Sequence, residues 1–82
     1  SHLKGGESMT ITLTGRTLGE NIKLARIKAN ISRKQLGDLL LMSESGVAYY
    51  ESGKNNVPPR KLEKIAEISG VTVEELKETK GA

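Results

Sequence analysis

The chain has 82 residues, enough for one small domain, and 13 Lys and Arg against 10 Asp and Glu give it a net charge of +3. This mild excess permits contact with nucleic acid without requiring it. The absence of cysteine excludes disulfides and thiolate metal sites, and a chain with two tyrosines as its only aromatic residues is poorly suited to stacking single-stranded bases.

The first part of the chain carries little helical signal. We interpret residues 1–8, which contain the only histidine, as a cloning remnant that ends before Met9. Residues 9–16 are expected to form an N-terminal arm, in which residues 10–14 (TITLT) alternate polar and apolar side chains as a short β-strand does. A single strand needs a partner, so this segment is either a flexible arm or a strand that pairs with another chain.

Start signals predict a domain of five helices over residues 17–79, followed by a short tail at 80–82. Three helices open on a capping box, in which a hydroxyl and a carboxylate or amide satisfy free backbone N–H groups. The three pairs are Thr17 with Glu20, Ser32 with Gln35, and Thr72 with Glu75. Ser43 is the N-cap candidate of the third helix, and Pro58 with Pro59 suits the start of the fourth.

The helix ends and the core are also readable from the sequence. Residues that accept a left-handed conformation are expected to end three of the helices: Asn30, Gly53 and Gly70. Between these signals, apolar residues repeat at helical spacing, which predicts an all-α fold, a compact five-helix bundle with an aliphatic core. The expected core positions are Leu18, Ile22, Ala25, Ala29, Leu36, Leu39, Leu40, Val47, Tyr50, Leu62, Ile65, Ala66, Ser69, Val73 and Leu76.

The second and third helices flank a three-residue turn at 41–43, and this arrangement is typical of a helix-turn-helix. Gly37 is expected where the two helices cross, because it has no side chain to separate them. The outer face of the third helix forms a stripe of mostly short side chains: Glu44, Ser45, Ala48, Tyr49 and Ser52. Such a stripe is either a plain solvated face or a surface that enters the major groove of DNA.

Four motifs stand together in this chain: S-x-x-x-L at 32–36, the Ser43 cap, YESGK at 50–54 and L-x-x-I-A at 62–66. With them, the segment from Leu18 to Leu76 resembles the Cro/phage-repressor (Xre-type) helix-turn-helix family. The resemblance implies a lambda-repressor-like fold and binding of double-stranded DNA by a transcriptional regulator of the repressor kind. It also implies a homodimer that binds two half-sites.

The resemblance further implies roles for individual residues. Base-reading positions fall on Glu44, Ser45, Ala48 and Tyr49. Phosphate-contacting positions fall on Arg33, Ser43, Lys54, Asn55 and Asn56. Arg26 and Glu51 match a pair that ties the first helix to the third, and we expect a bidentate structural bridge there rather than a DNA contact by Arg26.

The sequence departs from the family pattern at two positions. Leu41 stands where glycine is common, and a positive φ there would cost about 1 kcal/mol. Glu44 places a negative charge on a recognition helix that contains no Lys or Arg. Three readings of Glu44 remain open: it accepts a hydrogen bond from cytosine N4, DNA binding is weak, or this surface binds protein. Arg60 and Lys61 are interpreted as a solvated helix start.

Other functional classes find less support. An enzyme is the least supported class, and we expect no cofactor and no metal, because residues 17–79 contain no histidine, cysteine or glycine-rich phosphate loop. The main rival is a protein-interaction module on the same fold, such as a bridging domain, a coactivator or an antitoxin.

No apolar run approaches the roughly 20 residues that cross a membrane, so we expect a cytoplasmic protein. For the apolar residues off the core stripes, at Leu24, Ile27 and Ile68, two interpretations stand: they contact the arm or a second copy, or they are isolated exposed apolar residues, which are common.

Overall fold

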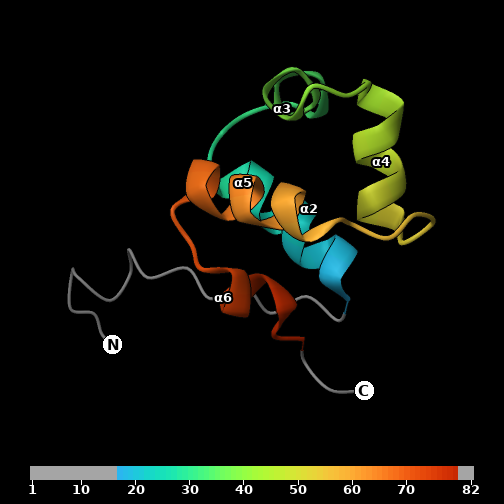
Figure 1. Ribbon diagram of the computed structural model, residues 1–82. Helices are drawn as coiled ribbons and strands as arrows, with labels where there is room; N and C mark the ends of the chain where they lie inside the picture. Colours follow the sequence, from blue (N-terminus) through green and yellow to red (C-terminus); the bar gives the residue numbers. More distant parts are fainter. Residues whose placement is uncertain (1–16, 80–82) are drawn as a thin grey trace.

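A computed structural model of the chain describes residues 17–79, and this range contains five helices (Figure 1). They are α2 (Leu18–Lys28), α3 (Arg33–Leu40), α4 (Glu44–Ser52), α5 (Pro59–Ser69) and α6 (Val73–Lys77). No strand occurs within 17–79, so the all-α prediction is confirmed. The predicted remnant at 1–8, arm at 9–16 and tail at 80–82 lie outside the described residues.

The helices begin where the capping residues predict. Two capping boxes are complete, that of Ser32 with Gln35 and that of Thr72 with Glu75. At the start of α2, the hydroxyl of Thr17 accepts a hydrogen bond from the N–H of Glu20 at 3.1 Å. The hydroxyl of Ser43 accepts one from the N–H of Gly46 at the same distance. Helix α5 starts at Pro59, where the missing N–H costs no hydrogen bond.

Each of the first four helices is followed by a residue with positive φ. These residues are Asn30 (φ 62°), Leu41 (φ 59°), Gly53 (φ 83°) and Gly70 (φ 73°). The left-handed conformation expected at the three predicted helix ends is therefore present. Leu41 also adopts it, with ψ 46°, so this bulky residue carries the strain of roughly 1–2 kcal/mol that glycine would avoid.

Helix α2 lies at the centre of the fold, where it contacts α4, α5 and α6, while α3 packs against α4 and α5 (Figure 1). The buried apolar core is aliphatic except for one tyrosine: Ile22, Ala25, Leu36, Leu40, Val47, Tyr50, Leu62, Ile65, Ala66 and Leu76. Leu39, which the sequence pattern placed in this core, is instead 48% exposed. The prediction was wrong because Leu36 and Leu40, four residues apart, occupy the inner face and leave Leu39 beside it.

Two glycines allow backbone segments to approach closely. A Cβ atom on Gly37 would lie 2.8 Å from the carbonyl oxygen of Met42, so this glycine faces the turn, whereas the sequence predicted a helix crossing there. A Cβ on Gly19 would lie 2.6 Å from the carbonyl oxygen of Tyr50 at the end of α4. Both sites therefore exclude any side chain, since backbone cannot move aside as a flexible side chain can.

A buried polar contact holds the last helix in place. The side-chain amide of Asn21, which is fully buried, donates to the carbonyl oxygens of Leu76 at 2.8 Å and Glu78 at 2.7 Å. Because a helix of five residues is unstable alone, these bonds and the buried Leu76 account for the position of α6. Among the described helices, none is long and apolar enough to span a membrane.

Candidate nucleic-acid interface

Helix α4 has two contrasting faces. Its inner face buries Val47, Tyr50 and Glu51. On its outer face, the stripe predicted from the sequence is open to solvent, with Glu44, Ser45, Tyr49 and Ser52 exposed and Ala48 half-buried. The described part of the chain therefore leaves this face uncovered, and a helix that stands clear of its own domain can be inserted into a groove.

The turn between α3 and α4 fixes how α4 is presented. The N–H of Met42 donates to the carbonyl oxygen of Gly37 at 2.8 Å, and the N–H of Leu41 donates to that of Asp38 at 3.3 Å. Ser43 then caps α4 immediately, so only three residues separate the two helices. The left-handed Leu41 closes α3 and redirects the chain, which leaves the relative position of α3 and α4 little freedom.

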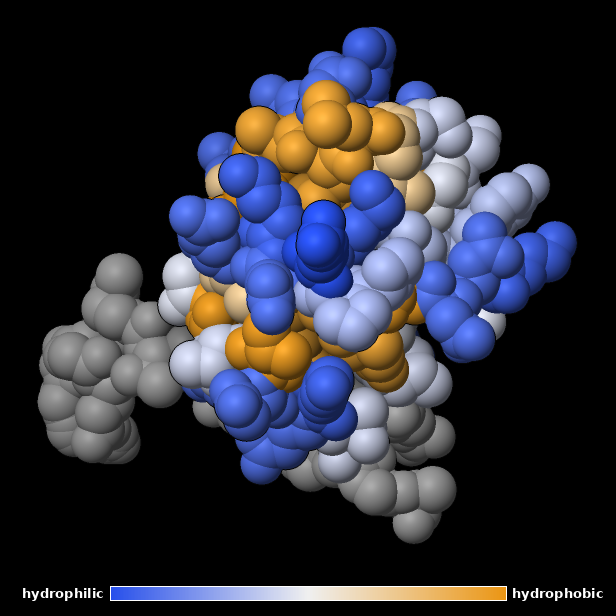
Figure 2. Space-filling model, viewed as in Figure 1, coloured by the Kyte–Doolittle hydropathy of each residue, from blue (hydrophilic) through white to orange (hydrophobic). Residues whose placement is uncertain are grey.

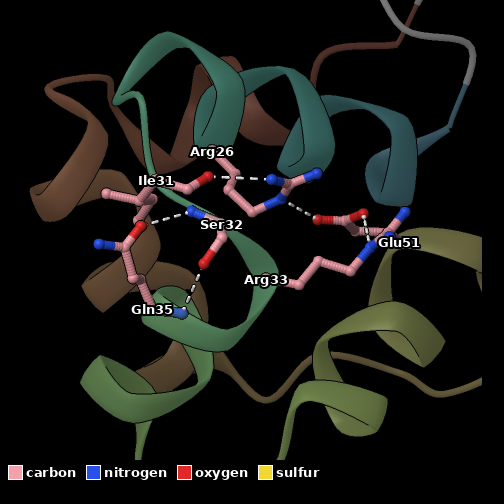
Figure 3. A network of polar contacts seen from close by, with 6 residues as sticks. All are labelled: Arg26, Ile31, Ser32, Arg33, Gln35 and Glu51. Carbon is pink, nitrogen blue, oxygen red and sulfur yellow. Dashed lines mark hydrogen bonds and ion pairs between the residues drawn. The ribbon is translucent and has the colours of Figure 1, made fainter.

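The carboxylate of Glu51 lies between two arginines (Figure 3). Its Oε2 accepts from Nε of Arg26 at 2.7 Å, and its Oε1 accepts from Nε of Arg33 at 3.0 Å. Nη1 of Arg26 turns to the carbonyl oxygen of Ile31 at 2.9 Å. The predicted Arg26–Glu51 contact is thus present but is not bidentate, because the second carboxylate oxygen is taken by Arg33 and the second guanidinium nitrogen by the backbone.

This cluster leaves a local excess of positive charge at the start of α3, since two guanidinium groups share one carboxylate. The side chain of Glu51 is buried and that of Arg26 is 11% exposed, whereas that of Arg33 is 41% exposed. Arg33 therefore has part of its side chain in solvent while its Nε is anchored. An arginine held in this way loses less side-chain freedom when it binds an anion.

The loop after α4 folds back on this helix. The N–H groups of Lys54 and Asn55 donate to the carbonyl oxygen of Tyr49 at 2.9 and 3.4 Å. The ammonium of Lys54 also lies 5.4 Å from the centroid of the Tyr49 ring, a cation–π distance. The structure therefore brings together one expected base-reading residue and one expected phosphate contact, and Lys54, Asn55 and Asn56 are all exposed.

Two lysines on the neighbouring helices have other contacts. Lys34 forms an exposed ion pair with Asp38 at 3.7 Å. Lys61 is half-buried, and its ammonium donates to the carbonyl oxygen of Leu40 at 3.0 Å, so it caps α3 and is not the simple solvated residue that the sequence indicated. Within residues 17–79, no group of three or more His, Cys, Asp or Glu side chains could hold a metal ion.

Comparison with known proteins identifies the family. A profile of helix-turn-helix domains matches residues 22–76. The chain belongs to this helix-turn-helix family, of the Cro/C1 type. The resemblance inferred from the sequence motifs is therefore confirmed, and the family places the chain among the DNA-binding transcription regulators.

One solved structure of this helix-turn-helix fold is the P22 c2 repressor protein in complex with synthetic operator 9T in the presence of Tl⁺. It superposes with a TM-score of 0.69 over 76% of this chain and 94% of the repressor chain, at 19% sequence identity. At this identity the likeness shows a shared fold. The comparison with curated proteins found no match.

Proposed function

We propose that this helix-turn-helix protein represses transcription by binding a specific double-stranded DNA site with α4 in the major groove. The observation that carries the proposal is the outer face of α4, which the described residues leave uncovered and which has two cations near it. Partly exposed Arg33 is hydrogen-bonded to Glu51 of α4, and exposed Lys54 lies over the ring of Tyr49. Cations beside a helix that reads base edges suit the two phosphate backbones that border a groove.

Base reading falls to the short side chains of the α4 stripe. The hydroxyl groups of Ser45 and Tyr49 both donate and accept hydrogen bonds, so each can pair with several base edges. Half-buried Ala48 offers a methyl group of the size that packs against thymine. Glu44 accepts only, and among base-pair edges its carboxylate suits the N4 amino group of cytosine, so we expect cytosine at the position it faces.

Phosphate contacts are assigned to residues around the stripe. Arg33 supplies its outer guanidinium edge, and Lys54 supplies its ammonium together with the amides of Asn55 and Asn56. Ser43 uses its hydroxyl oxygen to cap α4 and retains its O–H as a donor. With Arg33 and Lys54 as the two charged phosphate contacts of each protomer, the logarithm of affinity should fall with the logarithm of salt with a slope of about −2 per protomer.

We further propose that two copies bind two half-sites about one helical turn apart. The P22 c2 repressor structure contains operator DNA, which supports the same use of this fold here. Of the apolar residues considered for self-association, Leu24 and Ile27 on α2 are exposed. Ile68 is partly buried and packs against the core, which leaves Leu24 and Ile27 as the apolar residues available for a contact between copies.

The test is selection of bound duplexes from a random pool at low salt, followed by titration of the selected duplex at several salt concentrations. We expect an enriched half-site that contains cytosine, repeated at a fixed spacing, and affinity that falls with salt. The matched control is Glu44→Gln, which keeps the size of the side chain but removes its acceptor-only character, and should relax the preference for cytosine. Absence of enrichment, together with no duplex binding at low salt, would contradict the proposal.

The second candidate function is a protein-interaction module. It is favoured by Glu44 and by the absence of Lys and Arg from α4, since a carboxylate on this face repels phosphate. The same titration separates the two candidates. A module of this kind would show no salt-dependent retention on duplex of any sequence.

A further inference from the structure

Two leucines at the end of α3 are exposed in a way that the domain itself does not explain. Leu41 is 92% exposed and Leu39 is 48% exposed. Leu41 also holds φ 59°, where a bulky side chain is rare. Glycine or asparagine would relieve the strain and remove the exposed apolar surface at once. Because Leu41 costs the isolated domain both backbone strain and exposed apolar surface, its presence points to a contact with another molecule.

The two leucines border a groove between the end of α3 and the start of α5. The groove encloses about 360 Å³ and is lined by Leu39, Leu40, Leu41, Arg60, Lys61 and Lys64. Figure 2 shows apolar surface over α3 with hydrophilic side chains beside it over α5. The lining is thus apolar on one side and basic on the other, and it includes no carboxylate.

The lysine in the middle of the lining shapes this groove. Lys61 donates to the carbonyl oxygen of Leu40, which holds the start of α5 against the end of α3. Arg60 is exposed on one side of it, and Lys64 is partly balanced by an exposed ion pair with Glu67 at 3.8 Å. The rim therefore offers Arg60 and Lys64 to an anion while the leucines offer apolar contact.

We propose that this groove docks an acidic amphipathic segment of another protein. One or two apolar side chains of the partner would pack on Leu39 and Leu41, and its Asp or Glu residues would pair with Arg60 and Lys64. DNA is a poorer occupant, since phosphate gains nothing from leucine. A second copy is poorer as well, because a self-complementary contact would place the same cations against each other.

The surface is separate from the DNA-reading face. The groove is formed by α3 and α5, whereas base reading is assigned to the outer side chains of α4, and the groove lining includes none of them. The inference therefore does not depend on the proposed DNA function. Either surface can be removed by substitution while the other is kept.

The test uses labelled synthetic peptides of about 16 residues, a length at which a helix can form on contact. One peptide carries leucines four residues apart among glutamates, and its partner carries lysine in place of every glutamate. Binding to the full chain is measured by fluorescence anisotropy, and the contacted residues are located by amide chemical-shift changes. The decisive variant is Leu41→Gly, since glycine accepts φ 59° and the fold is kept.

We expect the acidic peptide to bind and to shift amide signals at the end of α3 and the start of α5. Its affinity should fall about tenfold in Leu41→Gly, and also in the double variant Arg60→Glu with Lys64→Glu. The control Lys23→Glu combined with Lys77→Glu reverses two exposed cations that lie outside the groove lining, and it should leave the affinity for the acidic peptide unchanged. Equal binding of the basic peptide, or full affinity in Leu41→Gly, would overturn the proposal. Three other results would also overturn it, because each assigns the groove to a different occupant. Leu41→Gly could convert a dimer of the chain into monomers, duplex DNA could shift the amides that line the groove, or the protein could bind anionic vesicles through the groove and not bind the peptide.

Discussion

Arg33 and Glu51 are joined by a 3.0 Å hydrogen bond from Nε to Oε1, and this bond links the first residue of α3 to the buried face of α4. The same carboxylate also accepts from Arg26 of α2. One buried anion therefore holds three helices, and it anchors the arginine to which we assign a phosphate contact. Stability and DNA affinity are expected to depend on this one side chain.

Replacement of Glu51 by glutamine should destabilise the fold by about 3 kcal/mol, because it leaves the largely buried guanidinium of Arg26 without its counter-charge. Denaturant unfolding followed by circular dichroism measures the loss. The control is Arg33→Gln, which removes the half-exposed partner and should cost no more than about 1 kcal/mol. Equal midpoints for Glu51→Gln and the unsubstituted chain would show that the cluster contributes nothing to stability.

Two substitutions on the proposed interface should differ in kind. Arg33→Ala removes a phosphate contact, so it should weaken binding to all duplexes alike and reduce the salt slope by about 1. Tyr49→Ala removes a base-reading side chain, so it should change which sequences a random pool yields. Anisotropy titrations and repeated selection measure the two effects. If both variants weakened every duplex equally, the assigned roles would be wrong.

Two glycine-to-alanine substitutions should separate rigid from yielding neighbours. Gly19→Ala places its Cβ 2.6 Å from the carbonyl oxygen of Tyr50, a backbone atom, and should cost about 1–3 kcal/mol. Gly46→Ala meets the terminal methyl of Met42, which can rotate away, so its stability should stay within about 0.5 kcal/mol. Thermal unfolding of the pair is the measurement. A larger loss in Gly46→Ala would contradict this account.

Asn21→Ala should loosen the end of the domain. It removes both donors to the carbonyl oxygens of Leu76 and Glu78, and leaving these buried or half-buried acceptors unpaired should cost about 2 kcal/mol. Amide hydrogen exchange should show α6 losing protection before the other helices. Glu78→Ala keeps the backbone acceptor and serves as the control, with no change expected. Unaltered protection of α6 in Asn21→Ala would refute the role of this amide.

Val47→Asp should unfold the domain, because Val47 is fully buried and the new carboxylate would have no partner. Ser45→Asp places the same charge on the exposed face of the same helix. We expect the second variant to retain a native helical spectrum while losing duplex binding by charge repulsion. A folded Val47→Asp would show that the inner face of α4 has been misidentified.

The sequence was sufficient for features set by neighbouring residues. Helix starts follow Ser32, Ser43 and Thr72, and the ends at Gly53 and Gly70 follow from the freedom of glycine, because caps are determined within a few residues. The exposed stripe on α4 was predictable for the same reason, since the helical period alone separates its two faces.

Contacts between distant segments were not predictable from the local sequence, and the one that was expected, between Arg26 and Glu51, came from the family resemblance. Arg33 was expected to face phosphate, and nothing in its local sequence indicated that Nε would bind Glu51. The same holds for Lys61, which caps a helix 21 positions away, and for Gly19, whose neighbour is the backbone of another helix. Leu39 was misplaced because helical spacing from Leu36 admits both Leu39 and Leu40 to the inner face, and the neighbouring helices cover Leu40 while leaving Leu39 48% exposed.

The bond from Asn21 to Glu78 places the two ends of the described domain side by side, since Asn21 lies one turn after Thr17. A short linker between residues 17 and 79 could therefore connect them and allow the chain to be opened elsewhere as a circular permutant. A label or fused domain attached directly at residue 17 or at residue 79 would emerge from the same region of the described domain. Such attachments would leave the outer face of α4 and the groove between α3 and α5 untouched, so both proposed binding surfaces can be studied with one immobilised protein.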